Sequence, residues 1–412
     1  MKITNLLCAP GRSGYFNKDL AAVRGGARQE GFGYIDPPVT PGFTQVVQPG
    51  EALSVMLLLE DGQVAYGDCI DVIFTGAAGR DPLFKAEQHR TVVEGTVRDL
   101  LVGRECGVFR PLAKEVEAFR VDGKPLHTAL RYGISQALLH AAALAHRCTA
   151  AEIVATEYES QISTVPIPIL GMCPTPHEFM VEKMIMKRDD IMPHGSFANV
   201  QTDLGAHGHK LIDYAAWVSQ LVQRTGAADY KPAIHLDVYG TIGELFDFDM
   251  ARMADYVGKV ADAAAPYELY LETPMIADSR QGQIDAFREL RAALISRGSV
   301  VRLVADEWCN TLDDIKAFAD AQAADYLQVK APDLGGIGNS IEALLYCRRA
   351  GAGVYMGGSA NETDQSARLS AHVALACQAD FLMNKPGQGV DEGLVVLTNE
   401  MARTLALIRA RG

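Results

Sequence analysis

The chain has 412 residues, of which 48% are hydrophobic and 22% are charged, so it can bury a core and is not of the disordered class. Its net charge of −13 argues against a nucleic-acid binder, which needs a basic face. No apolar run approaches the ~20 residues needed to cross a membrane. Eight cysteines without paired spacing, and an N-terminus without signal-peptide features, predict a cytoplasmic protein.

Residues 1–160 are predicted to form an α+β domain. Two apolar runs at 54–59 and 63–67 flank Asp61-Gly62, which is the pattern of a β-hairpin. Helices are expected near 87–102 and 126–145. In the second of these, apolar residues recur on one face, at Leu130, Ile134, Leu138 and Ala141.

Residues 161–412 are predicted to form a second domain, in which short apolar runs alternate with longer helical stretches. Eight runs are candidate strands, and they begin near Val165, Lys183, Ala233, Glu268, Val301, Tyr326, Gly353 and Asp380. Most of the intervals have the length of one strand–helix unit. Eight such units predict a TIM (β/α)8 barrel. A doubly wound sheet is the alternative, but eight successive parallel strands favour closure.

The third, fourth and fifth runs each end in a carboxylate, at Asp237, Glu272 and Asp306. Barrel enzymes carry their catalytic groups at the C-terminal ends of strands. Three converging anions would repel one another without a divalent cation. Hard oxygen ligands suit Mg²⁺, with Mn²⁺ as the second candidate. The alternative for any single acid is a helix N-cap or a surface position, which is a poorer explanation for three acids in register.

The sixth run, 326–330, places Gln328 and Lys330 on the same side of its strand, because strand side chains alternate. Both are expected to point into the barrel mouth. Burial and a nearby divalent cation would lower the pKa of Lys330, so that it could act as a base. The alternative is a structural lysine paired with a metal-binding acid.

Two loops on the same face add candidate residues. His194 is expected in the loop after the second strand, where it could take part in catalysis. Ser359 follows the paired glycines 357–358 after the seventh run. Paired glycines let the backbone approach a ligand closely, so the Ser359 hydroxyl and the neighbouring amides could hold a carboxylate.

These acids and the lysine resemble the metal-and-base arrangement of the enolase superfamily. The chain most closely resembles the methylaspartate ammonia-lyase family. The resemblance lies in the blocks Gly79-Arg80-Asp81-Pro82-Leu83-Phe84, Pro193-His194, His235-Leu236-Asp237-Val238-Tyr239-Gly240, Gln328-Val329-Lys330-Ala331-Pro332-Asp333-Leu334-Gly335-Gly336, Asn361-Glu362-Thr363 and Lys385-Pro386-Gly387.

The resemblance implies an N-terminal α+β capping domain, a TIM barrel and a homodimer. It implies Mg²⁺ as the metal, with K⁺ as an activator, and an amino-acid dicarboxylate as the substrate. The expected reaction removes ammonia from 3-methylaspartate or a related 3-substituted aspartate through an enediolate. The product would be of the fumarate type, and would be mesaconate for 3-methylaspartate. The alternatives are an enolase-superfamily dehydratase or epimerase, or a non-catalytic barrel, against which the acids and the lysine argue.

The resemblance also implies roles for individual residues. The metal would be held by Asp237, Glu272 and Asp306. Lys330 would take the proton from one substrate diastereomer, and His194 would serve the other from the opposite face. The remaining substrate contacts would be Gln328, Ser359, Ala360, Met172, Ile73 and Met383.

The chain departs from the family at four of these positions. Ile73 and Met172 stand where the family usually has glutamine, and Ala360 stands where cysteine is common. Ser359 replaces a common threonine and keeps the hydroxyl. Since two polar contacts become apolar, we expect a preference for a substrate with a bulkier or less polar substituent.

Overall fold

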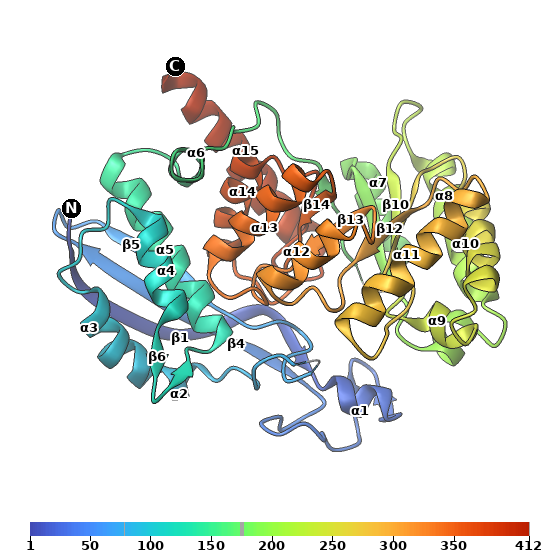
Figure 1. The fold of residues 1–412 in the computed structure, drawn as a ribbon, viewed down its shortest axis with the longest axis horizontal. Helices are drawn as coiled ribbons and strands as arrows, with labels where there is room; N and C mark the ends of the chain where they lie inside the picture. The colour runs from blue at the N-terminus through green and yellow to red at the C-terminus, as the bar shows by residue number, and fades with distance from the viewer. Residues whose placement is uncertain (78, 174–176, 412) are drawn as a thin grey trace.

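The computed structural model describes residues 1–77, 79–173 and 177–411. It has two parts that lie side by side in Figure 1: an antiparallel sheet covered by helices, which we call the first domain, and a closed β/α barrel. This confirms the predicted fold class. The last helix of the first part is α6 (Ala150–Tyr158), and the first barrel strand is β8 (Ile169–Leu170). The predicted division after residue 160 falls between them and stays a prediction.

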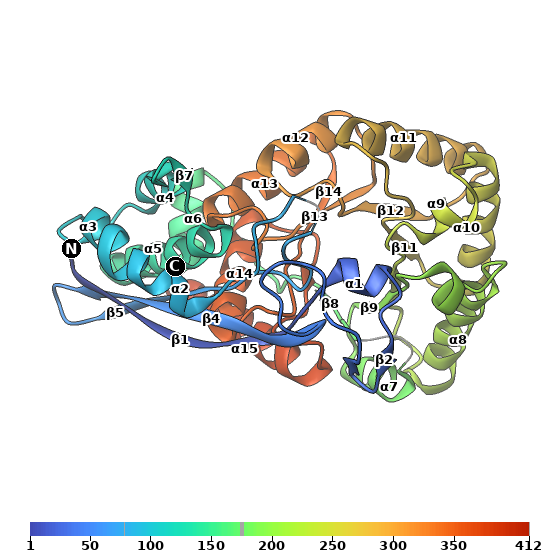
Figure 2. The same cartoon turned by 90° about the horizontal axis from the view of Figure 1, so that it is seen from below.

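The first part is built on three long strands in the order β1-β4-β5: β1 (Ile3–Lys18), β4 (Val47–Leu59) and β5 (Val64–Cys69). Strands β4 and β5 form the hairpin predicted around Asp61-Gly62. Seen from below, β1 and β4 run toward the barrel (Figure 2). Two short hairpins complete the strands of this part: β2 (Gln29–Glu30) with β3 (Gly33–Tyr34), and β6 (Arg120–Val121) with β7 (Lys124–Pro125).

Helix α5 (Thr128–His146) packs against β4 and β5. The predicted apolar face is confirmed, because Leu130, Ile134, Leu138 and Ala141 are all buried. The helix predicted near 87–102 is broken into three pieces by a π-helical turn: α2 (Ala86–Val92), η1 (Val93–Val97) and α3 (Arg98–Leu101). Two further helices of this part are α1 (Leu20–Arg24) and α4 (Phe109–Ala118).

Eight parallel strands close the barrel in the order β10-β11-β12-β13-β14-β15-β8-β9. Besides β8, they are β9 (Ile191–Ser196), β10 (Ala233–Asp237), β11 (Leu269–Glu272), β12 (Arg302–Ala305), β13 (Tyr326–Val329), β14 (Gly353–Met356) and β15 (Leu382–Met383).

The strand predicted near Lys183 is wrong, because Lys183 lies in α7 (Glu178–Lys187). Helix α7 buries Val181, Met184 and Ile185, which recur at helical spacing. A short apolar run does not by itself distinguish a buried strand from one face of a helix. The second barrel strand is β9, which begins at Ile191.

The other elements of the barrel part pack outside the strands or connect them. They are η2 (Val200–Leu204), α8 (His209–Thr225), α9 (Thr241–Leu245), α10 (Met250–Ala264), α11 (Arg280–Ser296), α12 (Leu312–Asp320), α13 (Ile337–Ala350), α14 (Asp364–Cys377) and α15 (Val390–Arg411). On β13, Leu327 and Val329 belong to the large core that includes these helices, as the alternation of the strand predicts.

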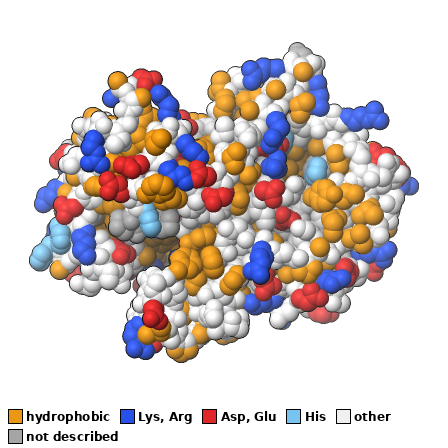
Figure 3. Space-filling model, turned by 180° about the vertical axis from the view of Figure 1, so that it is seen from behind, with side chains coloured by type: hydrophobic (Ala, Val, Ile, Leu, Met, Phe, Trp, Pro, Cys, Tyr) orange, Lys and Arg blue, Asp and Glu red, His pale blue; other side chains and the backbone are white. Residues whose placement is uncertain are grey.

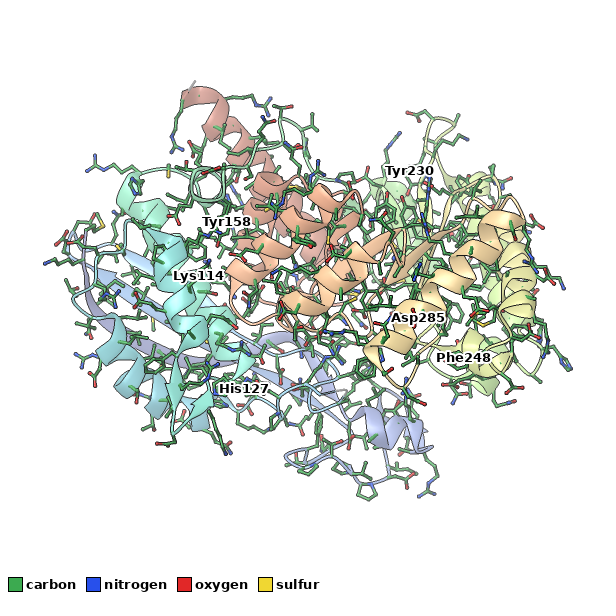
Figure 4. The ribbon with its side chains drawn as sticks, viewed as in Figure 1. Lys114, His127, Tyr158, Tyr230, Phe248 and Asp285 are labelled. Atoms are coloured by element: carbon green, nitrogen blue, oxygen red, sulfur yellow. The ribbon has the colours of Figure 1, made fainter. Side chains whose placement is uncertain are left out.

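The barrel has a defined mouth. Figure 4 labels Tyr230, which precedes β10, and Phe248, which follows it, and the two lie toward opposite ends of the barrel. In the same view α1 lies on the side of Phe248 (Figure 1), so the C-terminal ends of the strands face the side where α1 lies. A second, smaller apolar cluster inside the barrel includes Tyr270, Tyr355 and Phe381.

The surface drawn in Figure 3 intersperses acidic and basic side chains, so this face carries no basic stripe. Among the residues that the structure describes, no helix has both the length and the apolar content needed to cross a membrane.

The packing of α5 on β5 depends on glycine. A methyl group at Gly67 would overlap the backbone of Gly133 and Ala137. Gly67→Ala should therefore lower the free energy of unfolding by about 1–3 kcal/mol, the usual cost of overpacking. The control is Gly95→Ala, because a methyl group there meets no atom within 4 Å. Thermal unfolding followed by circular dichroism would contradict this account if both variants had the same midpoint.

Candidate active site

A cavity of about 120 Å³ opens at the C-terminal ends of the barrel strands, under segments of the first domain. Every residue that the sequence analysis named for the site lines this cavity. They are Ile73, Met172, His194, Asp237, Glu272, Asp306, Gln328, Lys330, Ser359, Ala360 and Met383. The geometry brings the named residues together, while their individual roles stay predictions.

The three acids end neighbouring strands. Asp237 and Glu272 are the last residues of β10 and β11, and Asp306 follows β12 directly. All three are buried. Burial, and then the charges of Glu272 and Asp306, raise the pKa of Asp237 well above its ordinary value. Burial, and then the charge of Asp306, raise the pKa of Glu272 to about 8. The site therefore disfavours the negative charges that it gathers.

Lys330 follows β13 directly, and its Nζ lies 2.7 Å from Asp306 Oδ2. Burial lowers the pKa of Lys330, but the negative charge of Asp306 and of nearby acids outweighs burial and raises the pKa above its ordinary value. The pKa of Lys330 is therefore raised by the nearby acids, and not lowered by burial as the sequence analysis expected. Lys330 is held as an ammonium group that neutralises part of the acid cluster.

His194 lies inside β9, so the prediction of a loop position is wrong. The pairing of β9 with β10 skips one residue: Pro193 pairs with His235, and Gly195 with Leu236. His194 is the extra residue of this β-bulge and has a φ of +49°. A bulge re-aims a side chain locally. Here it brings the buried His194 ring to the cavity.

His194 and Lys330 come from opposite sides of the barrel. Strands β9 and β13 are four places apart in the ring of eight, and β10, β11 and β12 lie between them on one side. Burial, and then the neighbouring His235, lower the pKa of His194 well below its ordinary value, so the ring is neutral near pH 7. The cavity thus has a cationic amine on one wall and a neutral imidazole on the other.

His235 is a functional candidate that the sequence analysis missed. Its Nδ1 lies 3.1 Å from His194 Nδ1, and its Nε2 lies 3.2 Å from Glu272 Oε2. Burial lowers the pKa of His235 to about 3, so this ring is also neutral. One neutral ring must donate through Nδ1 and the other accept, so the two rings have opposite tautomers. The available signal was the spacing of two residues between His235 and Asp237 on one strand.

Gln328 and Tyr355 fix the Glu272 carboxylate. Gln328 Nε2 donates to Glu272 Oε1 at 2.6 Å, and the Tyr355 hydroxyl donates to Glu272 Oε2 at 2.7 Å. Gln328 Oε1 is buried without a hydrogen-bond partner among the described residues. In this orientation Gln328 offers a ligand an acceptor. Its expected role as a carboxylate contact stays a prediction. Tyr355 was missed, because a tyrosine inside an apolar strand is indistinguishable from a core residue.

The turn after β14 contributes Ser359 and Ala360 to the cavity wall. Ser359 is buried, and its backbone N–H donates to Glu362 Oε2 at 3.2 Å. Ser359 Oγ accepts a hydrogen bond of 3.3 Å from the backbone N–H of Asn361. The hydroxyl hydrogen of Ser359 remains available to a ligand.

The apolar wall of the cavity is formed by Met172, Ala360 and Met383, with the half-buried Ile73 packed against them. Met172, Ala360 and Met383 belong to the cluster inside the barrel, so the wall is continuous with a packed core. Ile73 comes from the first domain, just after β5. The chemistry of this wall is therefore set jointly by the two domains.

The first domain also supplies Arg80, which the sequence analysis placed only in a matching block. Arg80 Nε donates to Asp333 Oδ2 at 2.8 Å, and Arg80 Nη2 lies 4.0 Å from Glu307 Oε2. This ion pair joins the segment before α2 to the loop after β13, close to Lys330. Long-range pairs of this kind have no signature in the sequence.

The donor groups fit a divalent cation in two arrangements that share Glu272. Asp237, Glu272 and Asp306 form an all-oxygen set, which is the type that Mg²⁺ prefers. His194, His235 and Glu272 form another set, whose donor atoms lie within 4.8 Å of one another. Two imidazoles favour a transition-metal ion such as Zn²⁺. The raised pKa values of Asp237 and Glu272 favour the all-oxygen set, because it is these anions that need a cation.

Comparison with known proteins identifies the family. The family model "Methylaspartate ammonia-lyase N-terminus" matches residues 1–159, and "Methylaspartate ammonia-lyase C-terminus" matches residues 161–410. The methylaspartate ammonia-lyase of Clostridium tetanomorphum is 45% identical over 412 residues, covering 100% of both chains. That of Haloarcula marismortui is 46% identical over 411 residues, covering 98% of this chain and 97% of its own.

Solved structures agree with the sequence matches. The Mg complex of β-methylaspartase from Clostridium tetanomorphum has a TM-score of 0.96 at 45% identity, covering 100% of both chains. Citrobacter amalonaticus methylaspartate ammonia lyase containing (2S,3S)-3-methylaspartic acid has a TM-score of 0.96 at 44% identity, covering 99% of this chain and 100% of that chain.

A more distant likeness concerns the fold alone. A muconate lactonizing enzyme from Pseudomonas fluorescens has a TM-score of 0.62 at 16% identity, covering 91% of this chain and 84% of its own. The sequence and structure matches at 44–46% identity span nearly the whole chain, so the protein belongs to the methylaspartate ammonia-lyase family.

Proposed function

We propose that this protein eliminates ammonia from 3-methylaspartate or a related 3-substituted aspartate and releases a fumarate-type product. The placement of Lys330 and His194 on opposite walls, with three acids on the strands between them, carries the proposal. Groups on opposite walls can reach either face of the carbon beside a substrate carboxylate. Membership of the family supports the reaction class.

Asp237, Glu272 and Asp306 would hold Mg²⁺, which is present in the Clostridium tetanomorphum complex. Bound Mg²⁺ would supply positive charge that stabilises the substrate carboxylate as the neighbouring carbon loses its proton. Mn²⁺ is the second candidate, and K⁺ is the expected activator. The hydrogen bond between His194 and His235 then supports the His194 ring, and Glu272 Oε2 lies 3.2 Å from His235 Nε2.

Lys330 accepts the substrate proton only as a neutral amine, so it must first give up the proton that Asp306 helps it retain. His194 is already neutral, and its bond to His235 holds the ring in place. The carbon–nitrogen bond of the substrate then breaks, and ammonia leaves from the carbon next to the one that lost its proton. Ser359 and Gln328 orient the substrate.

The substrate of this chain would carry an apolar group at carbon three, because Ile73, Met172, Ala360 and Met383 form an apolar wall. The Citrobacter amalonaticus relative contains (2S,3S)-3-methylaspartic acid. A methyl group or a larger alkyl group would gain hydrophobic contact at this wall. The protein is further proposed to be a cytoplasmic homodimer.

The two opposed groups can be separated by substrate stereochemistry. Lys330→Ala should lower the rate of ammonia release from one 3-methylaspartate diastereomer, and His194→Ala should lower it from the other. Each loss should be about 10²–10⁴-fold, which is usual when a general base is removed. Ammonia release and the ultraviolet absorbance of the new double bond would be measured. Lys259→Ala, at an exposed lysine, is the control. Retained activity in Lys330→Ala toward every diastereomer would refute the assignment.

The apolar wall can be tested with a series of 3-alkyl aspartates. Ile73→Gln combined with Met172→Gln should shift kcat/KM toward 3-methylaspartate and away from larger alkyl groups, since amides replace apolar contacts. Each lost contact should be worth a factor of about ten, corresponding to ~1–2 kcal/mol. An unchanged order of preference in the double variant would mean that these two residues do not select the substrate.

Metal binding should compete with protons at Glu272. Its pKa in the folded chain is about 8, above the ordinary 4.5, so the folded protein without metal binds more protons than the unfolded chain. The stabilising protonation is therefore lost as the pH rises from about 4.5 to about 8. Mg²⁺ should raise the unfolding midpoint more near pH 8 than near pH 5.5, because it replaces those protons. Differential scanning fluorimetry with and without EDTA measures this shift.

The matched control is Glu272→Gln, which removes one titrating group and should reduce the pH dependence of the Mg²⁺ shift, while the raised pKa of Asp237 leaves part of it. An equal Mg²⁺ shift at both pH values in the unaltered protein would contradict the assignment of Glu272 as a metal ligand.

A further inference from the structure

A buried ion pair lies beneath the turn that follows β14. Lys385 Nζ and Glu362 Oε2 are 2.8 Å apart, and both side chains are completely buried. Lys385 also donates to the carbonyl oxygen of Gly357 at 2.6 Å. Glu362 accepts a hydrogen bond from the Ser359 backbone N–H at 3.2 Å. The pair thus bonds to the turn at both ends, at Gly357 and at Ser359.

The turn lies directly on this pair. A methyl group at Gly358 would overlap Glu362 Oε2 and approach Lys385 Nζ to 2.5 Å. No side chain larger than hydrogen fits there, so the backbone of the turn is seated on the charged groups themselves. A buried charge is costly unless it is paired and hydrogen-bonded, and this pair has partners at both residues. A shift of either charged side chain would therefore move the backbone of the turn that it bonds to.

The first domain completes the network. The Tyr132 hydroxyl, on α5, donates to Glu362 Oε1 at 2.5 Å. Tyr132 is completely buried. Oε1 of Glu362 therefore bonds to the first domain, and Oε2 contacts the turn and Lys385.

The residues on either side of Glu362 are also bound to the first domain. The backbone N–H of Gly14 donates to the carbonyl oxygen of Asn361 at 3.1 Å, and the Ser13 hydroxyl donates to Asn361 Oδ1 at 3.0 Å. The Thr363 hydroxyl donates to Asp68 Oδ2 at 2.5 Å. Three consecutive residues, 361–363, are thus held by β1, β5 and α5. This segment follows the cavity-lining Ser359 and Ala360 directly.

We propose that Tyr132, Glu362 and Lys385 are positioning residues, through which the first domain sets the turn 357–360 in place to bind the substrate. The inference rests on the proposed function, since it takes Ser359 to be a substrate contact. None of the three residues lines the cavity, so each acts through the turn and not on the substrate. The network makes part of the substrate site dependent on the docking of α5.

The test is a double-mutant cycle between Tyr132→Phe and Ser359→Ala, with kcat and KM measured by ammonia release. Tyr132→Phe removes one hydroxyl and keeps the ring, so the fold should be retained. Alone, it should raise KM about tenfold, the factor that the loss of one hydrogen bond to a charged group produces, with kcat changed less than twofold. Combined with Ser359→Ala, it should add less than threefold, because both changes remove the same contact.

Tyr256→Phe is the matched control. Tyr256 is also buried, and its hydroxyl donates to the carbonyl oxygen of Gly208 at 2.6 Å, away from the cavity. It should lose a similar amount of thermal stability without a change in KM.

Three results would overturn the inference: a KM for Tyr132→Phe equal to that of Tyr256→Phe, effects that multiply fully in the double variant, or an unchanged KM in Ser359→Ala. If the unaltered enzyme released no ammonia from any 3-substituted aspartate, the proposed function would fail separately. Calorimetric titration of the same variants with mesaconate would then decide the inference, because it measures the turn's contribution to binding without turnover. Equal affinities of Tyr132→Phe and Tyr256→Phe for mesaconate would overturn it.

Discussion

The structure depends on the gathering of carboxylates at a buried barrel mouth. Asp237, Glu272 and Asp306 end adjacent strands, and burial together with mutual repulsion raises the pKa of the first two. Neighbouring groups partly offset this repulsion. Lys330 pairs with Asp306, while Gln328 and Tyr355 donate hydrogen bonds to Glu272. A buried cavity that gathers negative charge binds a cation favourably, and the same negative charge raises the pKa of Lys330.

The two domains contribute to the cavity in different ways. The barrel supplies the groups that can move protons or hold a metal, on rigid strand ends. The first domain supplies Ile73 to the apolar wall and Arg80 to an ion pair beside the loop after β13. It also holds residues 361–363 through β1, β5 and α5. The shape of the cavity therefore depends on the fit between the domains as well as on the barrel.

Much of this site could be predicted from the sequence, because strand ends and the alternation of side chains are local patterns. They located Asp237, Glu272, Asp306, Gln328 and Lys330. The prediction failed where the pattern is ambiguous or the contact is remote. The run that begins near Lys183 fits both a strand and one face of a helix, and the bulge at His194 adds one residue without a composition signal. The bonds of Arg80 and Tyr132 join positions more than two hundred residues apart.

Gly358 limits how the specificity of this cavity can vary. Because its Cα lies against the Lys385–Glu362 pair, this point of the chain is closed to side-chain variation. Changes that reshape the pocket without disturbing the buried charges must instead fall on the apolar wall. Of its residues, Ile73 belongs to the first domain and lies outside the packed strands. Substitutions at Ile73 and its neighbours in the first domain would therefore change the substrate that fits, while the acids and Lys330 on the barrel stay the same.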